Sequence, residues 1–332
     1  MKFSTNDNSG LIKVILLLKS HSMEYLSGQD LSDVLKISRV AVWKHIKKIK
    51  ELGYDIESKQ KLGYRIKSIT DSLLPWEVTS NLDTEQIGKS VYFFESTNST
   101  QDQAKKIAAK NAKDGIVITT NMQTAGRGRN GRRWISPKGG IWFSVILRPK
   151  FDVSAVTLFP MAASLALSRA IKNTLGIKTE LKWPNDITIR GKKVAGMLVD
   201  ASLESNKIEE LILGVGINFD IDVKSVKEQL ADMPNFYGVA SLAGNKKCRP
   251  VILVQAFLKE LENVYFQMNH KKTNDIIKEW TELSSTIGRN VKVNTGDMII
   301  SGQATQIDHD GALVISYKNE IVRVMAGDVI HV

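Results

Sequence analysis

Residues 126–133 form a short stretch that combines three glycines with four arginines, Gly-Arg-Gly-Arg-Asn-Gly-Arg-Arg. Glycine lets a backbone approach a ligand closely, and the planar guanidinium of arginine can bind phosphate or carboxylate oxygens through two parallel hydrogen bonds. The combination predicts a loop that holds a polyphosphate. An arginine-rich surface loop or a contact with nucleic acid would explain the same residues, and the stretch alone leaves these alternatives open.

The stretch also matches the pattern G-x-G-x-x-G of dinucleotide-binding proteins, at Gly126, Gly128 and Gly131. That fold requires the third glycine to open a helix within a strand-turn-helix unit. Here residues 140–147 predict a second strand instead, and no Gly-Lys-Ser or Gly-Lys-Thr of a P-loop follows. We therefore reject both nucleotide-binding motifs for this stretch.

Four further polar strings lie next to predicted strands. They are Glu-Ser-Thr-Asn-Ser at 95–99, Lys-Trp-Pro-Asn-Asp at 182–186, Lys-Lys-Val-Ala-Gly at 192–196 and Gly-Val-Gly-Ile-Asn at 214–218. In this order, and with the arginine-rich stretch, they resemble the biotin protein ligases over approximately residues 80–332. The strings G-R-G-R-x-G-R and K-W-P-N-D are highly specific for that family.

The resemblance implies which residues bind biotin. Side chains that would hydrogen-bond the ureido ring, a neutral cyclic urea, are Ser96, Thr97, Asn98 and Gln123. Groups that would hold the biotin carboxylate and the α-phosphate are Arg127, Gly128, Arg129 and Lys193. Residues 96–99 also suit a cap for the following helix, and the two roles are compatible.

The resemblance also implies nucleotide contacts, which are Arg132, Trp134, Lys182, Asn185 and Asn218. The catalytic candidates are Lys193, Arg129 and Asp186. An ammonium at Lys193 would offset charge while a carboxylate attacks the α-phosphorus; an exposed hairpin lysine is the alternative. Asp186 is a candidate ligand for the Mg²⁺ that accompanies ATP and a candidate base for the acceptor lysine. For the glycines before Asn218, close packing alone is the alternative role.

The implied activity uses ATP, biotin and Mg²⁺ to form biotinyl-AMP and then transfers biotin to a lysine of a biotin carboxyl-carrier protein. Because biotin's carboxylate is the first nucleophile, no Ser/His/Asp or Cys/His constellation is needed, and none is evident. The chain has a single cysteine, Cys248, and five scattered histidines, so we expect no structural zinc site. A loop that orders over the adenylate would exclude water. A non-catalytic biotin-sensing regulator and a ligase for lipoate or another acyl group are the alternatives.

The elements that carry these residues begin with a small N-terminal module. Apolar residues at helical spacing predict two short helices; they are Ile12, Ile15, Leu16 and Leu18, then Leu31, Val34 and Leu35. Ser27 and Asp30 suit a capping box before the second helix. Ser38 can cap a third helix, whose inward positions are Val42, Ile46 and Ile49. That helix ends near Gly53, and residues 54–58 and 64–67 predict a hairpin with a basic tip.

The outward face of the third helix carries residue types that reach phosphates and base edges in a major groove. The candidate DNA-binding residues are Ser38, Arg39, Trp43, Lys44 and Lys47. Residues 8–67 therefore resemble the winged helix-turn-helix family, which implies operator DNA as a partner. A three-helix bundle with a charged face, or a winged helix that binds protein, is the alternative.

The charge distribution favours the DNA-binding interpretation. Residues 1–70 hold 13 lysines and arginines against seven aspartates and glutamates, a net charge of +6, whereas the other 262 residues hold 33 against 28, a net charge of +5. A basic module is thus joined to a nearly balanced body, as expected if the module meets a polyanion.

Beyond a linker or joining helix near residues 71–77, strands and helices alternate, and the turn at Arg190-Gly191-Lys192 indicates hairpin succession. We predict an α+β multidomain protein: a winged helix at 1–70, a mixed, mainly antiparallel sheet with flanking helices at 71–284, and a small barrel at 285–332. By resemblance, the central part is a class II synthetase-like biotin ligase domain and the barrel is SH3-like. The barrel either caps the central domain or takes a direct part in binding ATP or the carrier protein, and Arg323 is the one barrel residue that we single out for a direct role.

No apolar run approaches the roughly 18 to 20 residues that span a bilayer, and no secretion signal is evident, so we expect a cytoplasmic protein. The family resemblance implies a homodimer when the adenylate is bound, which would place two winged helices on a two-part operator.

Overall fold

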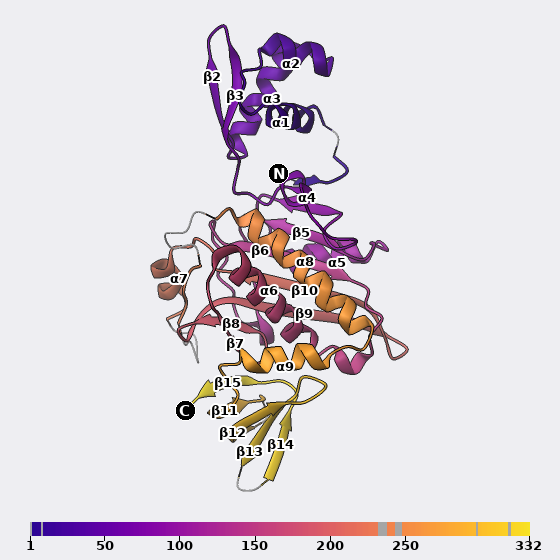
Figure 1. Cartoon of the computed structure of the whole chain (residues 1–332), viewed down its shortest axis with the longest axis vertical. Helices are drawn as coiled ribbons and strands as arrows, with labels where there is room; N and C mark the ends of the chain where they lie inside the picture. The colour runs from indigo at the N-terminus through magenta and orange to yellow at the C-terminus, as the bar shows by residue number, and fades with distance from the viewer. Residues whose placement is uncertain (1, 8, 232–237, 243–247, 297, 318–319) are drawn as a thin grey trace. The chain divides into compact units, whose positions relative to one another are not determined.

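The computed structural model describes residues 2–7, 9–231, 238–242, 248–296, 298–317 and 320–332. Its internal contacts divide the chain into two compact units (Figure 1). The smaller unit is Phe3–Ser72, and the larger is Leu73–Val332 with Lys2.

The described part of the smaller unit contains three helices followed by a two-stranded hairpin (Figure 1). The elements are α1 (Gly10–Ser20), α2 (Gly28–Leu35), α3 (Arg39–Glu51), β2 (Asp55–Lys59) and β3 (Gly63–Ser68). Their order confirms the predicted winged helix-turn-helix.

Both predicted helix caps are formed. Ser27 Oγ accepts a hydrogen bond from the Asp30 backbone N–H at 3.0 Å, and Asp30 Oδ2 accepts one from the Ser27 N–H at 3.0 Å. Ser38 Oγ accepts from the Ala41 N–H at 3.2 Å. These bonds satisfy backbone donors that the first turn of a helix leaves free.

The core of the smaller unit follows the predicted helical spacing in part. Val42, Ile46 and Ile49 of α3 are buried, as predicted. Leu16 and Val34 are instead 49% and 63% exposed, because each lies on its helix away from the buried side chains. Spacing identified the helices but did not select every core residue.

Gly63 ties the wing to the segment before α2. Its φ of +114° is strained for a residue with a side chain, and a Cβ here would lie 2.0 Å from the Leu26 carbonyl oxygen. Leu26 and Tyr64 exchange backbone hydrogen bonds of 3.0 and 2.9 Å. The glycine therefore allows the wing to pair closely with the helical part.

The strands from β4 to β7 in an eight-stranded sheet of the order β1-β4-β5-β6-β10-β9-β8-β7 form the centre of the larger unit, and the edge strand β1 spans the boundary in the chain between the two units. The strands are β1 (Lys2–Ser4), β4 (Val91–Phe94), β5 (Ile116–Thr120), β6 (Ile141–Leu147), β7 (Glu180–Lys182), β8 (Asp186–Ile189), β9 (Lys192–Glu204) and β10 (Lys207–Ile217). Strands β4 and β5 run parallel, and every neighbouring pair from β5 to β7 is antiparallel. The predicted mixed, mainly antiparallel sheet is confirmed.

Helices cover both faces of this sheet. The helix α5 (Thr100–Ala108) packs on one face, against Ile118, Ile146 and other buried side chains. The helices α6 (Phe159–Leu175) and α8 (Pro250–Asn269) pack on the other. Because side chains alternate along a strand, β6 directs Ile146 toward α5 and its neighbour Val145 toward α6 and α8.

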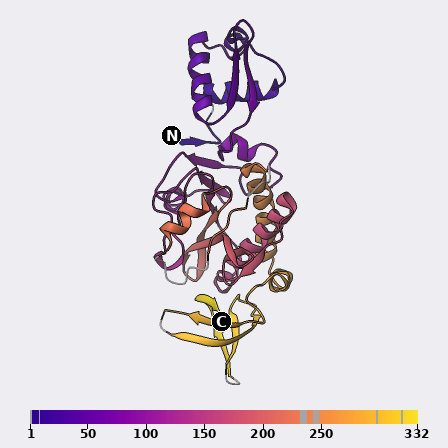
Figure 2. The same cartoon turned by 90° about the vertical axis from the view of Figure 1, so that its left-hand side faces the viewer.

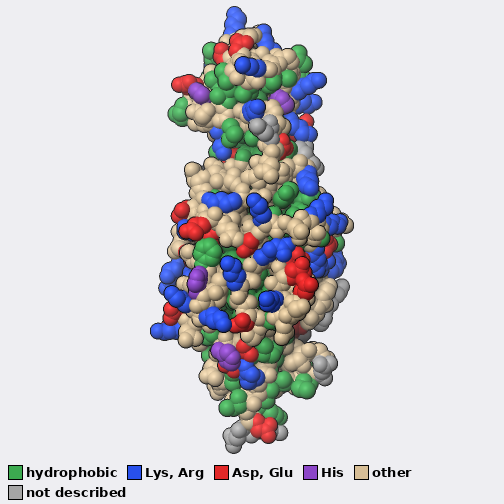
Figure 3. Space-filling model, turned by 90° about the vertical axis from the view of Figure 1, so that its right-hand side faces the viewer, with side chains coloured by type: hydrophobic (Ala, Val, Ile, Leu, Met, Phe, Trp, Pro, Cys, Tyr) green, Lys and Arg blue, Asp and Glu red, His purple; other side chains and the backbone are tan. Residues whose placement is uncertain are grey.

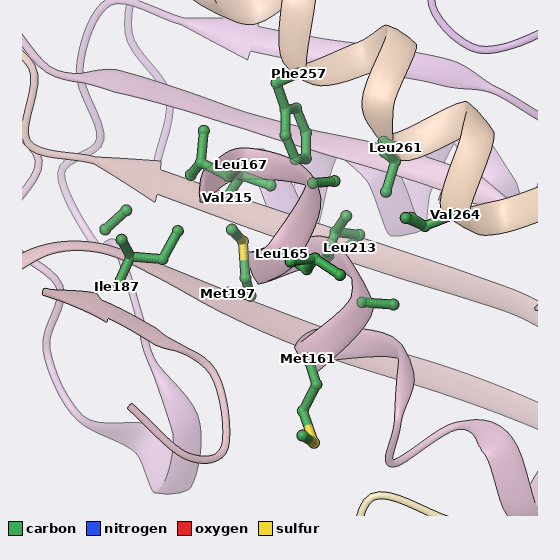
Figure 4. Packing of buried hydrophobic residues seen from close by; sticks show 14 of the residues in the cluster. Met161, Leu165, Leu167, Ile187, Met197, Leu213, Val215, Phe257, Leu261 and Val264 are labelled. Carbon is green, nitrogen blue, oxygen red and sulfur yellow. The ribbon is translucent and has the colours of Figure 1, made fainter. Parts of the chain in front are cut away.

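Figure 4 shows the larger of these two cores. Leu165 and Leu167 of α6 lie between the sheet and α8, from which Phe257 and Leu261 project. Phe143 of β6 meets Phe257 edge to face, with ring centroids 5.5 Å apart. This packing makes the sheet a rigid base for the residues at its edges.

Several short elements complete the description of the larger unit. The joining helix predicted after the wing is α4 (Pro75–Thr79), and α9 (Asn274–Glu282) agrees with its predicted position. Besides the three-residue strand β1, three helical elements were not predicted: the helix α7 (Val223–Gln229) and the 3-10 turns η1 (Arg129–Gly131) and η2 (Val153–Ala155). Each is seven residues or shorter, so helical periodicity cannot reveal it.

The C-terminal strands form a five-stranded antiparallel sheet (Figure 2) in the order β14-β13-β12-β11-β15. They are β11 (Asn290–Asn294), β12 (Ile299–Ile307), β13 (Leu313–Tyr317), β14 (Glu320–Val324) and β15 (Asp328–His331). Sequence analysis predicted the first four and missed β15, whose partner β11 lies far back in the chain.

Backbone and side-chain bonds fasten this sheet to the central one. Leu181 of β7 accepts from the Ser285 N–H at 2.8 Å and donates to the Leu283 carbonyl at 2.9 Å. The Trp183 indole N–H donates to the Gly311 carbonyl at 3.0 Å. Residues 181–183, at the start of the Lys-Trp-Pro-Asn-Asp string, are therefore fixed by bonds to the C-terminal part of the chain.

The surface charge of the larger unit is mixed. On the face shown in Figure 3, lysine and arginine side chains are interspersed with aspartate and glutamate. Among the helices formed by the described residues, none has both the length and the apolar character needed to cross a bilayer.

Candidate functional site

A cavity of about 180 Å³ lies where the sheet meets the arginine loop, defined here as residues 126–134. Its walls come from β6, β8, β9 and β10, from the start of α5, and from this loop. Of the C-terminal sheet, Asp328 also lines it. The cavity thus gathers all four polar strings and the arginine-rich stretch singled out in the sequence.

The polar end of the cavity is a hydrogen-bonded network at the start of α5. Gln123 Oε1 accepts from the Thr100 N–H at 2.8 Å, and Gln123 Nε2 donates to Ser136 Oγ at 2.9 Å. Ser144 Oγ donates to Gln101 Oε1 at 2.7 Å. These bonds hold donors and acceptors in fixed directions before any ligand enters.

The residues at 95–99 are placed differently from the prediction. Ser96 and Asn98 are exposed, and neither they nor Thr97 lines the cavity. Thr97 Oγ1 accepts from the Gln103 amide and Asn98 Oδ1 accepts from Thr124, so both brace the loop. The cavity-lining positions begin at Ser99, because the strand ends before the string and α5 turns its first residues inward.

Glycine next to the sheet allows the arginine loop to approach it. The loop closes on itself through bonds from the Trp134 N–H to the Gly126 carbonyl and from the Gly128 N–H to the Arg132 carbonyl, at 2.9 and 2.7 Å. A Cβ at Gly216 of β10 would lie 2.6 Å from the Trp134 ring. The Gly-x-Gly at 214–216 therefore makes room for this ring while lining the cavity.

Two arginines link the loop to the C-terminal sheet. Arg132 Nη2 lies 2.6 Å from Asp328 Oδ2. Arg129 Nη1 donates to the Gly327 carbonyl at 3.4 Å and to Asn185 Oδ1 at 3.5 Å. Burial lowers the pKa of the Arg129 guanidinium, and the charges of Asp328 and Asp186 oppose this effect.

Asp328 is a site residue that sequence analysis missed. It lies 196 positions after Arg132, in the strand β15 that was also missed. A lone aspartate after Ala-Gly carries no local signal of such a contact. Arg127, which was predicted, lines the cavity but directs its guanidinium to Asp102 at 2.6 Å.

Lys193 lies at the centre of the site. Its Nζ is 2.6 Å from Asp186 Oδ1 and 4.9 Å from the centroid of the Trp134 ring. A Cβ at Gly196 would lie 3.0 Å from Lys193 Cε, so this glycine keeps space for the lysine. The next lysine, Lys192, is exposed, as the hairpin interpretation predicted.

A β-bulge directs Lys193 into the cavity. On β8 and β9, Ile187 pairs with Ala195 but Thr188 pairs with Lys193, so Val194 is an extra residue. Val194 and Ala195 are both buried in the core, and side-chain alternation is therefore shifted between Lys193 and the rest of the strand. Lys193 can then share a face with Asp186.

The two candidate asparagines line the cavity but also bond to the backbone. Asn185 Nδ2 donates to the Met197 carbonyl, and Asn218 Nδ2 donates to the Lys193 carbonyl at 3.3 Å. Asn218 N–H donates to the Val194 carbonyl at 2.8 Å. Both residues therefore fix the bulged strand that carries Lys193.

Lys182 does not line this cavity, contrary to its predicted place with the other nucleotide contacts. It lines a second, adjacent cavity and is 8% exposed. Burial lowers its pKa to about 8; the charge of Lys193 acts in the same direction, and those of Asp186 and Asp328 oppose it.

A metal ion would find two carboxylates at the first cavity, Asp186 and Asp328. Oxygen ligands of this kind suit Mg²⁺. Elsewhere in the described residues, Asp308, His309 and Asp310 lie within reach of one another. Arg323 already bonds to both of these aspartates, at 2.7 and 2.8 Å, so its guanidinium stabilises this turn and does not reach the first cavity.

In the smaller unit, the candidate DNA-contacting residues lie on the outward face of α3. Arg39, Trp43, Lys44 and Lys47 are all exposed, whereas Ser38 caps the helix. Val40, which was not predicted, adds a 63% exposed apolar side chain beside the 57% exposed Trp43. An exposed apolar pair flanked by cations suits contact with thymine methyl groups and phosphates.

Three family models match separate parts of the chain. The Biotin/lipoate A/B protein ligase family matches residues 93–218, the HTH domain matches residues 11–65, and the Biotin protein ligase C terminal domain matches residues 286–332.

Individual proteins match along most of the chain. It is 32% identical over 317 residues to the Bifunctional ligase/repressor BirA of Bacillus subtilis (strain 168), covering 95% of this chain and 97% of the relative. It is also 32% identical over 242 residues to the Biotin--[acetyl-CoA-carboxylase] ligase of Mycobacterium tuberculosis, covering 71% and 86%. Among solved structures, the biotin protein ligase from Aquifex aeolicus in complex with biotin and ATP is similar, with a TM-score of 0.60, 26% identity and coverage of 73% of this chain and 97% of that one.

Proposed function

The chain belongs to the family of bifunctional biotin ligase/repressors, and from this premise we propose that its first cavity joins biotin to AMP and passes biotin to a lysine of a biotin carboxyl-carrier protein. The observation that carries the proposal is the convergence of Lys193, Asp186, Arg129 and Trp134 on that cavity. We keep the division into a winged helix at 1–70, a ligase domain at 71–284 and a C-terminal domain at 285–332.

The polar end of the cavity suits the ureido ring of biotin. A neutral cyclic urea needs both donors and acceptors, which the network around Thr100, Gln123 and Ser144 offers. Ser99 replaces Ser96, Thr97 and Asn98 in our assignment, because it lines the cavity and they do not. The biotin carboxylate would then extend toward Lys193 and Arg129.

In the first step, an oxygen of the biotin carboxylate forms a bond to the α-phosphorus of ATP, the α–β bridging bond breaks, and pyrophosphate leaves. Lys193 and Arg129 would stabilise the charge that develops on the phosphoryl oxygens. Asp186 would hold the Lys193 ammonium in place. Mg²⁺ bound with ATP, with Asp186 or Asp328 as ligand, would shield the phosphate oxygens.

In the second step, the amine of the acceptor lysine attacks the acyl carbon and AMP leaves. The adenylate must be kept from water until the acceptor arrives. The cavity of about 180 Å³ is smaller than the roughly 300 to 1,000 Å³ of common ligand sites. We therefore expect the arginine loop, with its contacts from Arg132 and Trp134, to rearrange around the nucleotide.

The smaller unit would act as a repressor module in the cytoplasm. We propose that Arg39, Trp43, Lys44 and Lys47 of α3 contact operator DNA. A dimer formed when the adenylate is bound would place two such helices on two half-sites. Ligand binding and operator binding would then strengthen each other by the same factor.

Incubation with labelled biotin, ATP and a biotin carboxyl-carrier domain tests the proposal. We expect labelled carrier and one pyrophosphate and one AMP for each biotin transferred. Binding of biotin without release of pyrophosphate would instead support a non-catalytic sensor. Transfer of lipoate in preference to biotin would support an acyl ligase of another specificity.

A further inference from the structure

A second cavity, of about 530 Å³, lies beside the first in the larger unit. It is bordered by β7 and β8, by the turn at Arg190 and Gly191, by the segment before β11, and by β15. The central sheet and the C-terminal sheet thus both contribute to it. The lining of this cavity and that of the first share no residue.

Three of the ten residues that line the second cavity carry cationic side chains. Lys182 is buried in its wall, while Arg190 and Arg289 are exposed. Glu180 is the acidic residue of the lining, and Thr188 Oγ1 donates to it at 3.3 Å. Within the described parts of the chain, neither arginine forms an ion pair. The two exposed guanidinium groups therefore give the rim of this cavity a positive charge.

His331 adds a neutral polar group to the lining. Burial, together with the charges of Lys182 and Arg289, lowers the pKa of its imidazole to about 4, and the charge of Glu180 opposes this shift. The ring is therefore neutral near pH 7 and can donate one hydrogen bond. Its Nε2 is buried and has no hydrogen-bond partner within the described residues.

The two cavities are neighbours on one face of the sheet. Along β8, Asp186 lines the first and Thr188, two residues on, lines the second. Residues two apart on a strand share a face and lie roughly 7 Å apart. Lys182 pairs with Asp186 across β7 and β8, and β15 likewise contributes Asp328 to the first cavity and Val329 to the second. An anion leaving the first cavity therefore has a cationic site directly beside it.

We propose that the second cavity binds the inorganic pyrophosphate that the adenylation step releases. This inference rests on the proposed function, which supplies pyrophosphate in the adjoining cavity. Lys182, Arg190 and Arg289 are spread over the lining of the cavity. A ligand with two phosphate groups fits this arrangement better than a ligand with one carboxylate, because each guanidinium or ammonium group can bind a separate phosphate oxygen.

Calorimetric titration of the full chain with sodium pyrophosphate tests the site without requiring catalysis. We expect wild type to bind pyrophosphate and the double variant Arg190→Gln/Arg289→Gln to bind it at least about tenfold more weakly. Lys272→Gln, which removes an exposed charge elsewhere, should match wild type. Equal affinity in wild type and the double variant would overturn the inference. Because both arginines are exposed, the double variant should fold, and circular dichroism checks this.

Steady-state kinetics separate released pyrophosphate from the phosphates of bound ATP. We expect the double variant to raise the inhibition constant of pyrophosphate while leaving the KM for ATP unchanged. An equal rise in both would assign the cavity to ATP and overturn the inference. If wild type binds pyrophosphate through these arginines but never adenylates biotin, the binding site stands and the proposed function fails.

Discussion

The ammonium Nζ of Lys193 lies 2.6 Å from Oδ1 of Asp186. The two residues stand on adjacent antiparallel strands, and the ammonium also lies over the ring of Trp134, 4.9 Å from its centroid. A carboxylate and an aromatic face together restrict the direction in which the ammonium can point. Because Asp186 lies outside the arginine loop, it can hold the ammonium in place while that loop rearranges around the nucleotide.

Lys193→Met should lower the rate of adenylate formation by about 10² to 10³, the loss typical of removing one group that stabilises developing charge. Pyrophosphate release from ATP and biotin measures this rate. Lys192→Met is the matched control, since Lys192 is the adjacent lysine and is exposed. Equal rates in the two variants would remove Lys193 from the mechanism.

Arg132→Gln and Asp328→Asn should each speed the escape of the adenylate by up to about fivefold, because a partly exposed ion pair contributes at most about 1 kcal/mol. The pair joins the arginine loop to β15 across 2.6 Å. Release of labelled adenylate from the purified complex measures the effect. The double variant should release it no faster than either single variant; additive effects would show that the two residues act independently.

Arg129→Gly should let the adenylate escape and label lysines indiscriminately, because the loop loses its bonds to the Gly327 carbonyl and Asn185. Labelling of an unrelated lysine-rich protein measures this. Asn130→Gly is the control for added flexibility: it places a glycine at a position with φ of +52° and leaves Arg129 intact. Retention of the intermediate by Arg129→Gly would contradict the role.

The stability of the wild type relative to Lys182→Met should rise by about 1 to 2 kcal/mol between about pH 8 and about pH 9.5. The folded pKa of Lys182 is lowered to about 8 from 10.5, so in this window the unfolded chain binds a proton that the folded chain does not. Stability therefore increases with pH. Urea unfolding of both proteins measures the difference, and a difference that is independent of pH would show that Lys182 titrates normally.

Biotin plus ATP should tighten operator binding, since ligand and DNA binding are reciprocally coupled. Gel shifts with and without both ligands measure the change, and identical affinities would remove the proposed regulation.

Lys47→Gln should weaken binding to all DNA sequences. It should also reduce the slope of the logarithm of the binding constant against the logarithm of salt concentration by about one, because one phosphate contact is lost. An unchanged salt slope would show that Lys47 does not contact a phosphate.

Local signals account for the features that were predicted correctly. Ser27 and Ser38 cap helices through backbone N–H groups three residues away, and short turns join the strands β7, β8, β9 and β10. Both kinds of interaction act within a few residues, so type and spacing suffice to predict them. Ser96, Thr97 and Asn98 show the limit of motif transfer, because the motif located the loop without determining which of its side chains turn inward.

The amino-acid sequence by itself determined the longer helices, most strands and the set of strings from which the site is built. Only the tertiary structure decided that a bulge at Val194 turns Lys193 toward Asp186, that Asp328 reaches Arg132 across 196 positions, and that Lys182 faces the second cavity. The physical reason is that strand register and the pairing of β11 with β15 depend on how distant segments pack together. A one-residue shift in register reverses the direction of every side chain beyond it.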